Sequence, residues 1–150
     1  MKKISTALAA LGIAAAAALA APAAAQAAPS APATGTAKSA AAPNGYFYAW
    51  EHADRGGHQC AWKYDSGDWS TCGAFNMRNK ASSLENRGYA GAYEDVDLFW
   101  GTWYSGSKNC LPNGAYRNNL TGIYFLWDGK SGQGQSMNDN ISSHSWSNNC

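Results

Sequence analysis

Beyond residue 44, short runs of aromatic and β-branched residues alternate with glycine, asparagine and serine. No apolar spacing of three and four residues persists there beyond a turn or two, so the pattern does not favour helices. Short runs between turn-forming residues are typical of strands, and this spacing predicts an all-β sandwich or barrel. A single helical turn is expected at residues 79–85. The expected strands are residues 46–50, 59–64, 91–100, 109–111 and 123–127.

The N-terminal pattern is different. Lys2 and Lys3 give a short positive region, residues 4–21 are almost wholly apolar, and residues 25–27 have the small-x-small form of a cleavage site. This predicts a secretory signal peptide over residues 1–27 and a secreted, extracellular protein. A retained membrane span is the alternative, but the run is rich in alanine rather than leucine, and we expect no membrane partner.

Residues 28–44 carry one charge, Lys38, and no aromatic residue. Such a stretch buries too little apolar surface to offset its ordering entropy, which predicts a disordered leader rich in alanine, proline and threonine, or a short pro-segment. One ordered domain is expected at residues 45–150. Without the signal peptide, nine basic residues face ten acidic ones, so the formal charge is −1. That charge predicts no nucleic-acid partner.

All four cysteines lie in the expected domain, and an even count in a secreted chain predicts two disulfides with three possible connectivities. A hairpin turning at residues 65–67, with Gly67 in the left-handed conformation, would set Cys60 opposite Cys72. A zinc site is the alternative, but the chain lacks a CxxC pair. The expected disulfides are Cys60 with Cys72 and Cys110 with Cys150.

The chain repeats itself: the spacing of Trp50, Gly56 and Cys60 recurs fifty residues later. An oxygen-rich hexapeptide follows each copy, at residues 78–83 and 138–143. One such hexapeptide can be a turn whose side chains bond local N–H groups. Two copies favour a cation site, because calcium takes six to eight oxygen ligands. Two copies of one β unit predict paired Greek keys.

These spacings resemble the βγ-crystallin superfamily, whose Greek keys begin with an aromatic residue and continue five residues later with aromatic-x-Gly. Phe99, Tyr104 and Gly106 match this pattern in the second copy. The first copy departs from it, because Arg55 stands at the second aromatic position and the glycine can be either of residues 56 and 57. The resemblance implies a small β-sandwich built from a pair of Greek-key motifs, with a weakened aromatic corner in the first.

Calcium-binding members of that superfamily carry a hexapeptide of two Asn or Asp, two variable residues, Ser or Thr, and Ser. Residues 138–143 match it throughout, and residues 78–83 match except at Arg78. The resemblance therefore implies Ca²⁺ as a cofactor, with one competent site and one weak or lost. The implied ligands are the Glu51 carbonyl and the side chains of Asn79, Ser82, Asn138, Asp139 and Ser142.

Residues 45–150 also resemble the small bacterial secreted proteins grouped as peptidase inhibitor family I36, through the segments FYAWEHADRGGHQC, RNKASSL, CLPNG and NDNISSHSW. This resemblance implies inhibition of an extracellular protease, most simply a metalloprotease, and we expect a monomer. No reactive-site motif matches. The candidate inhibitory loop is residues 111–120, with Pro112, Tyr116 and Arg117 for a substrate-like contact. An ordinary Greek-key crossover is the alternative.

The chain lacks HExxH and GxSxG, so two common hydrolase signatures are absent. Asp95 and Asp97, with Glu94, could form a glycosidase-like pair, but they alternate with Val96 and Leu98, which predicts the solvated face of a strand. We expect no enzyme. Surface or turn roles are expected for the isolated histidines, His52, His58 and His144.

The chain has seven tryptophans and eight tyrosines. Most are expected to build the corners and core of the fold. Two alternatives to inhibition follow from the fold and these rings: a carbohydrate or cell-wall binding module, and a toxin-like antimicrobial protein. In the first, Trp62, Trp69 and Trp103 would stack on sugars.

Overall fold

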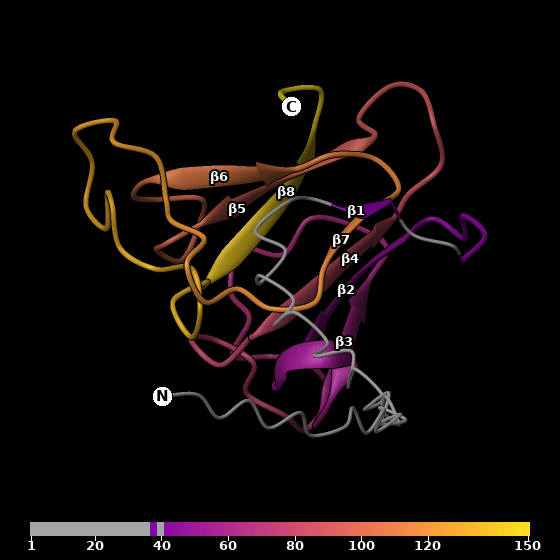
Figure 1. Cartoon of the computed structure of the whole chain (residues 1–150), viewed down its shortest axis with the longest axis horizontal. Coiled ribbons are helices and arrows are strands. Elements are labelled where there is room, and N and C mark those ends of the chain that lie inside the picture. The colour runs from indigo at the N-terminus through magenta and orange to yellow at the C-terminus, as the bar shows by residue number, and fades with distance from the viewer. Residues whose placement is uncertain (1–36, 39–40) are drawn as a thin grey trace, which may run out of the picture. The chain divides into compact units, whose positions relative to one another are not determined.

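Eight strands and one short 3₁₀ helix occur in the residues that this computed structural model describes, 37–38 and 41–150 (Figure 1). The predicted signal peptide lies outside the described residues. Among the described residues, no helix has the length and apolar character needed to cross a membrane. The elements are β1 (Ala37–Lys38), β2 (Tyr46–Trp50), η1 (Ala53–Arg55), β3 (Gln59–Trp62), β4 (Ser83–Arg87), β5 (Asp95–Phe99), β6 (Lys108–Leu111), β7 (Ala115–Arg117) and β8 (Ser143–Ser147).

The strands form two antiparallel sheets, with the orders β1-β7-β4-β2-β3 and β6-β5-β8 (Figure 1). Each copy of the repeat contributes one segment to the sheet of the other copy. From the second copy, β7 pairs with β4, where Leu84 lies opposite Arg117. From the first copy, Ser66 forms a bridge with His144 in β8. This exchange confirms the predicted all-β sandwich of paired Greek keys.

The predicted strand 46–50 is β2, and the predictions at 59–64, 91–100 and 109–111 overlap β3, β5 and β6. The helical turn predicted at 79–85 is wrong, because β4 begins at Ser83. Residues 123–127 form no strand and make only the isolated bridge from Tyr124 to Ser136. Four strands, β1, β4, β7 and β8, have no counterpart among the predictions. In the N-terminal segment predicted to be a leader, β1 pairs with β7.

The core takes side chains from both sheets and from the loops between them. Phe47 and Leu84 come from one sheet, and Val96, Leu98 and Leu111 come from the other. Several buried loop side chains complete it. They are Trp69, Met77, Ala81, Leu120, Phe125, Met137 and Ile141.

The two predicted disulfides, Cys60 with Cys72 and Cys110 with Cys150, are present. The hairpin invoked for the first of them is wrong. Cys72 pairs with Phe75 instead, and Gly67 has no left-handed backbone. Because all four cysteines are in disulfides, they offer no thiolate for the alternative zinc site.

Candidate cation sites

A tight corner follows β2 and supports the first hexapeptide. Asp54 and Arg55 both adopt left-handed backbone conformations, with φ of 55° and 63°. The Ser83 hydroxyl accepts the Arg55 N–H at 3.1 Å and donates to the His52 carbonyl at 2.7 Å. The first residue of β4 thereby fixes the corner that follows β2.

A matching corner follows β5. Trp103 and Tyr104 have φ of 53° and 62°, and the Ser143 hydroxyl accepts the Tyr104 N–H at 3.1 Å. The same hydroxyl donates to the Gly101 carbonyl at 2.6 Å. The structural repeat is therefore 49 residues at this point, one less than the sequence spacing suggested.

Arg55 replaces the second aromatic residue of the first corner without leaving a gap. In the second corner, the rings of Phe99 and Tyr104 meet edge to face at 5.8 Å. In the first, the Arg55 guanidinium lies 5.8 Å from the centre of the Trp50 ring. It also lies 4.8 Å from the ring of Tyr116. A cation on an aromatic face therefore substitutes for the expected ring pair.

The two hexapeptides cross, so that each serine hydroxyl meets an oxygen of the other copy. Ser82 Oγ lies 3.4 Å from Asp139 Oδ1, and Ser142 Oγ lies 2.9 Å from Asn79 Oδ1. Asn79 and Asp139 both have left-handed backbone, with φ of 58° and 57°. Each also donates its N–H to a carbonyl of the opposite hexapeptide, at 2.9 and 3.0 Å. We call the Ser82–Asp139 pair the first cation site and the Ser142–Asn79 pair the second.

A hollow of about 360 Å³ lies at the first cation site. Asp139 contributes a carboxylate there, and Asn138 Nδ2 holds its other oxygen at 2.8 Å. The pKa of the Glu51 carboxyl is lowered because the His58 side chain and N–H bond it, so this group stays ionised. The residues around the hollow are Glu51, His52, Asn79, Lys80, Ser82 and Asp139.

The first hexapeptide carries two positive side chains, Arg78 and Lys80, of which Lys80 also lines the hollow. The Lys80 ammonium lies 4.9 Å from the centre of the Phe75 ring, and Arg78 pairs with the Asp68 carboxylate at 3.4 Å. The first cation site thus has hard oxygen donors that include a carboxylate, which fits calcium. The second cation site pairs a neutral amide with a hydroxyl, so it has less charge to offer an ion.

The candidate inhibitory residues lie in the Greek-key crossover. Tyr116 and Arg117 belong to β7, which has β4 on one edge and β1 on the other. Arg117 is half-buried, and loss of solvent lowers its pKa. The Pro112 carbonyl accepts a hydrogen bond from the Ala115 N–H in the turn that precedes β7. Tyr116 and Arg117 therefore lie in a strand bonded on both edges rather than in a free loop, and Pro112 lies in the turn before it.

The predicted solvated face of β5 is wrong, because Asp95 and Asp97 are buried. Lys108 Nζ contacts Asp97 Oδ2 at 2.6 Å, and Asn149 Nδ2 donates to the same oxygen at 3.1 Å. The Cys150 N–H donates to Asp95 Oδ2 at 3.0 Å. The C-terminal residues therefore cover these carboxylates and exclude them from a solvent-facing acid pair.

The surface role predicted for His144 is also wrong. Its ring is fully buried, and Trp69 Nε1 donates to His144 Nδ1 at 2.8 Å. Burial lowers the pKa of His144 to about 3. The three predicted sugar-stacking residues do not form one exposed surface, because Trp69 is buried and Trp62 stacks on it at 4.9 Å, while Trp103 is exposed.

No protein-family model and no curated protein matches the sequence. A solved structure from work on the evolution of the eye lens βγ-crystallin domain fold aligns with a TM-score of 0.51 and 16% identity, covering 74% of this chain and 95% of that one. A βγ-crystallin from Ciona intestinalis aligns at 0.48, with 18% identity and coverage of 68% and 99%. An archaeal βγ-crystallin aligns at 0.47, with 17% identity and coverage of 67% and 95%. The first of these likenesses shows that the chain has the βγ-crystallin fold.

Proposed function

We propose that this chain is an exported, non-catalytic calcium-binding protein that inhibits an extracellular peptidase. The crossing of the two hexapeptides carries the calcium proposal. Ser82 meets Asp139, and Ser142 meets Asn79, across 57 and 63 residues of sequence. Oxygen donors of these types suit calcium, whose affinity rises with the charge of the ligand set. The first cation site therefore binds calcium more tightly than the second.

Calcium is expected to raise the melting temperature, because an ion that binds only the folded chain stabilises it by about 2.7 kcal/mol at one hundred times its Kd. Asp139→Ala removes the side-chain oxygens of the first cation site and should abolish most of this shift. Asp128→Ala is the matched control, since that carboxylate lies in another loop and pairs with Lys130 at 3.6 Å. Calorimetric melting at millimolar calcium, with magnesium for comparison, measures the effect. An unchanged melting temperature contradicts calcium binding.

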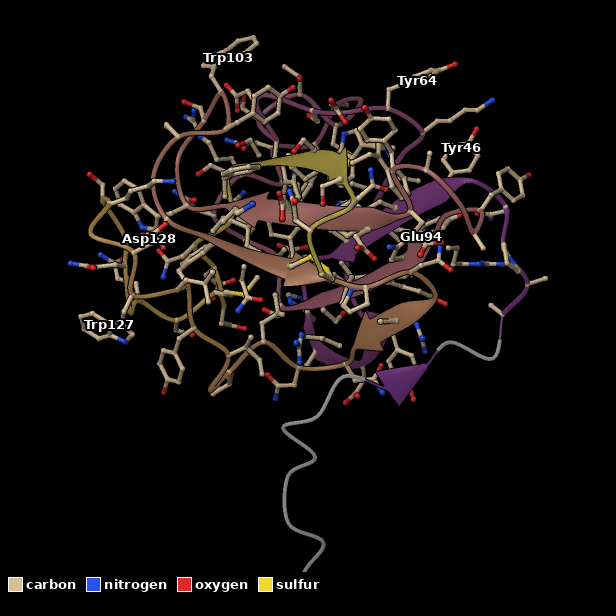
Figure 2. The ribbon with its side chains drawn as sticks, turned by 90° about the horizontal axis from the view of Figure 1, so that it is seen from above. Tyr46, Tyr64, Glu94, Trp103, Trp127 and Asp128 are labelled. Carbon is tan, nitrogen blue, oxygen red and sulfur yellow. A yellow bond between two sulfur atoms is a disulfide. The ribbon has the colours of Figure 1, made fainter. Side chains whose placement is uncertain are left out.

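A rigid apolar loop favours the inhibitory activity. Leu126 and Trp127 lie between β7 and β8, and Trp127 is 80% exposed (Figure 2). The Leu126 N–H donates to the Lys108 carbonyl at 2.9 Å, and Ser107 Oγ donates to the Leu126 carbonyl at 2.6 Å. Phe125 anchors the loop in the core. A loop already held in place can fill a protease cleft without an ordering cost.

Incubation with residues 28–150 is expected to abolish the activity of a thermolysin-type metalloprotease in proportion to the amount added, and to leave a subtilisin-type serine protease active. Trp127→Ala should relieve the inhibition because it removes the exposed anchor of the loop. Trp103→Ala is the control, because Trp103 is 74% exposed at another corner. The residual activity of each protease is measured. Full activity of both proteases would contradict the inhibitory proposal and leave the calcium proposal unaffected.

A further inference from the structure

A second hollow, of about 290 Å³, lies away from both cation sites. It is formed by the start of β2, the end of β3, the loop between β4 and β5, and one side chain of β8. Tyr46, Tyr64 and Glu94 are chain neighbours of its lining residues and lie on one side of the domain (Figure 2). We call it the Tyr93 hollow. Its lining residues are Gly45, Lys63, Gly88, Tyr89, Ala92, Tyr93 and Trp146.

Three aromatic rings dominate the Tyr93 hollow. Tyr89 and Tyr93 are 66% and 65% exposed, and Trp146 is half-buried. Clustered exposed rings around a concavity are the composition of a ligand site, because they offer apolar faces together with polar groups at their edges. The predicted sugar-stacking tryptophans are absent from it.

The rings rest directly on glycine backbone. A Cβ atom at Gly45 would lie 2.8 Å from Tyr89 Cε2, and one at Gly88 would lie 2.6 Å from Trp146 Cζ3. Side chains at these two positions would push the rings away. The two glycines therefore set the width of the hollow.

The loop that carries the two tyrosines is fixed at its base. Asn86, which is fully buried, donates to the carbonyl of Glu94 at 2.8 Å and accepts the Gly88 N–H at 2.8 Å. Asn113 Nδ2 donates to the Gly88 carbonyl at 3.0 Å. Two asparagines thus clamp both ends of the loop. The hollow is preformed, which lowers the cost of ordering it around a ligand.

The backbone of Tyr93 supports a role beyond folding. Tyr93 has φ of 57°, an unfavourable value for a bulky residue, and its N–H is held by Asn148 Oδ1. The other six non-glycine residues described with positive φ form pairs related by the internal repeat. They are Asp54 with Trp103, Arg55 with Tyr104, and Asn79 with Asp139. Tyr93 has no such mate, so the repeat does not explain its strain.

The charges around the hollow favour an uncharged ligand. Lys63 is the one charged residue among those that line it. Beside it, Asp65 accepts the Trp146 N–H at 2.8 Å, and Glu94 accepts the Gly91 N–H at 2.6 Å. These two carboxylates lie in segments that border the hollow, and their negative charge disfavours an anionic ligand. A flat ligand with apolar faces and many hydroxyls fits both the aromatic rings and the polar rim, by which we mean Lys63, Asp65 and Glu94.

We propose that the Tyr93 hollow binds an uncharged oligosaccharide, whose sugar rings stack on Tyr89 and Tyr93 while its hydroxyls bond Lys63 and the rim. The volume is near the lower end for ligand pockets, so it takes one or two sugar rings. Further sugar rings of the oligosaccharide would extend over the neighbouring Tyr46 and Tyr64. This site is independent of calcium and of the loop that carries Trp127.

Calorimetric titration of the full mature chain with chitotriose and with cellotriose tests the proposal, with trigalacturonate as the acidic comparison. At least one neutral trisaccharide should bind, more tightly than the acidic one. Tyr93→Ala should weaken that binding about tenfold, the effect of losing one stacked ring. Tyr124→Ala is the control, because Tyr124 is a half-exposed tyrosine in another loop.

Any of four results would overturn the proposal. They are no binding of either neutral trisaccharide, binding of the acidic one alone, equal weakening by the control, and a peptide or protein bound at Tyr93 in place of the sugars. The melting temperature of Tyr93→Ala should match that of the parent chain, since the side chain is exposed, and so a loss of binding would not reflect unfolding.

Discussion

Lowering the pH from 7 to 4 is expected to reduce the free energy of unfolding by roughly 3 kcal/mol through His144 alone. The pKa of this residue is about 3 in the folded chain, against an ordinary value of 6.5. Between these values the unfolded chain binds a proton at this position and the folded chain does not. The contribution is therefore fully present above about pH 6.5 and is lost as the pH falls toward 3.

The surroundings of His144 explain why its charged form is excluded. Its ring centre lies 4.7 Å from that of Phe47, 5.1 Å from that of Trp62 and 5.6 Å from that of Trp69. Nδ1 accepts the Trp69 Nε1–H, which places the proton of the neutral ring on Nε2. A second proton would have to enter at Nδ1, where it would face that donor. Protonation thus requires both desolvation of a cation and loss of a buried hydrogen bond.

Urea unfolding at pH 7 and pH 4 measures this effect. His144→Gln should flatten the pH dependence, because a neutral amide can accept the Trp69 hydrogen bond without titrating. His52→Gln is the control, since His52 is exposed. Carboxylates such as Asp68, whose pKa is lowered chiefly by the Ser70 N–H, contribute in all three chains. Equal pH slopes in the parent and in His144→Gln would refute the assignment.

The elements that sequence predicted well are those whose hydrophobic residues carry the signal. β2 is an unbroken run of aromatic and apolar residues, and it was located to the residue. β4 and β8 escaped prediction because they bury polar side chains, such as Ser83, Asn86 and Ser143, whose partners lie in distant corners and loops. No local pattern distinguishes a serine that fixes a remote corner from a serine in a turn. The disulfide pairing was right although its supporting hairpin was wrong.

The candidate sites likewise include features that the sequence reveals and features that depend on the fold. The hexapeptides are local patterns, so the sequence could nominate Asn79, Ser82, Asp139 and Ser142. Their crossing depends on the exchange of segments between the two sheets, and it decides which site holds the carboxylate. The Tyr93 hollow combines four separate segments and a backbone conformation that composition does not reveal. The tether at Cys110 suggested a free loop over residues 111–120, whereas residues 115–117 of that segment form β7 and complete a sheet.

Removing the Cys110–Cys150 disulfide by double substitution to alanine is expected to reduce the free energy of unfolding by roughly 4 kcal/mol, because it closes the longer loop. Removing Cys60–Cys72 should cost roughly 3 kcal/mol on the same loop-entropy model. The separations are 40 and 12 residues. The model compares unfolded chains, so it predicts a difference of only about 1 kcal/mol between the two disulfides.

Contacts in the folded structure should make the difference between the two disulfides in the free energy of unfolding larger than this. Cys150 and Asn149 cover Asp95 and Asp97, and the Asp97 carboxylate also pairs with Lys108 inside the sheet. Without the tether, these C-terminal residues can leave and expose the two acids to water. Denaturant unfolding of both double variants under non-reducing conditions measures the ranking. Hydrogen exchange of the Cys110→Ala, Cys150→Ala double variant should show that the backbone amides of β5 lose protection. If the Cys60–Cys72 variant is the less stable of the two, the C-terminal cover does not stabilise β5 as inferred.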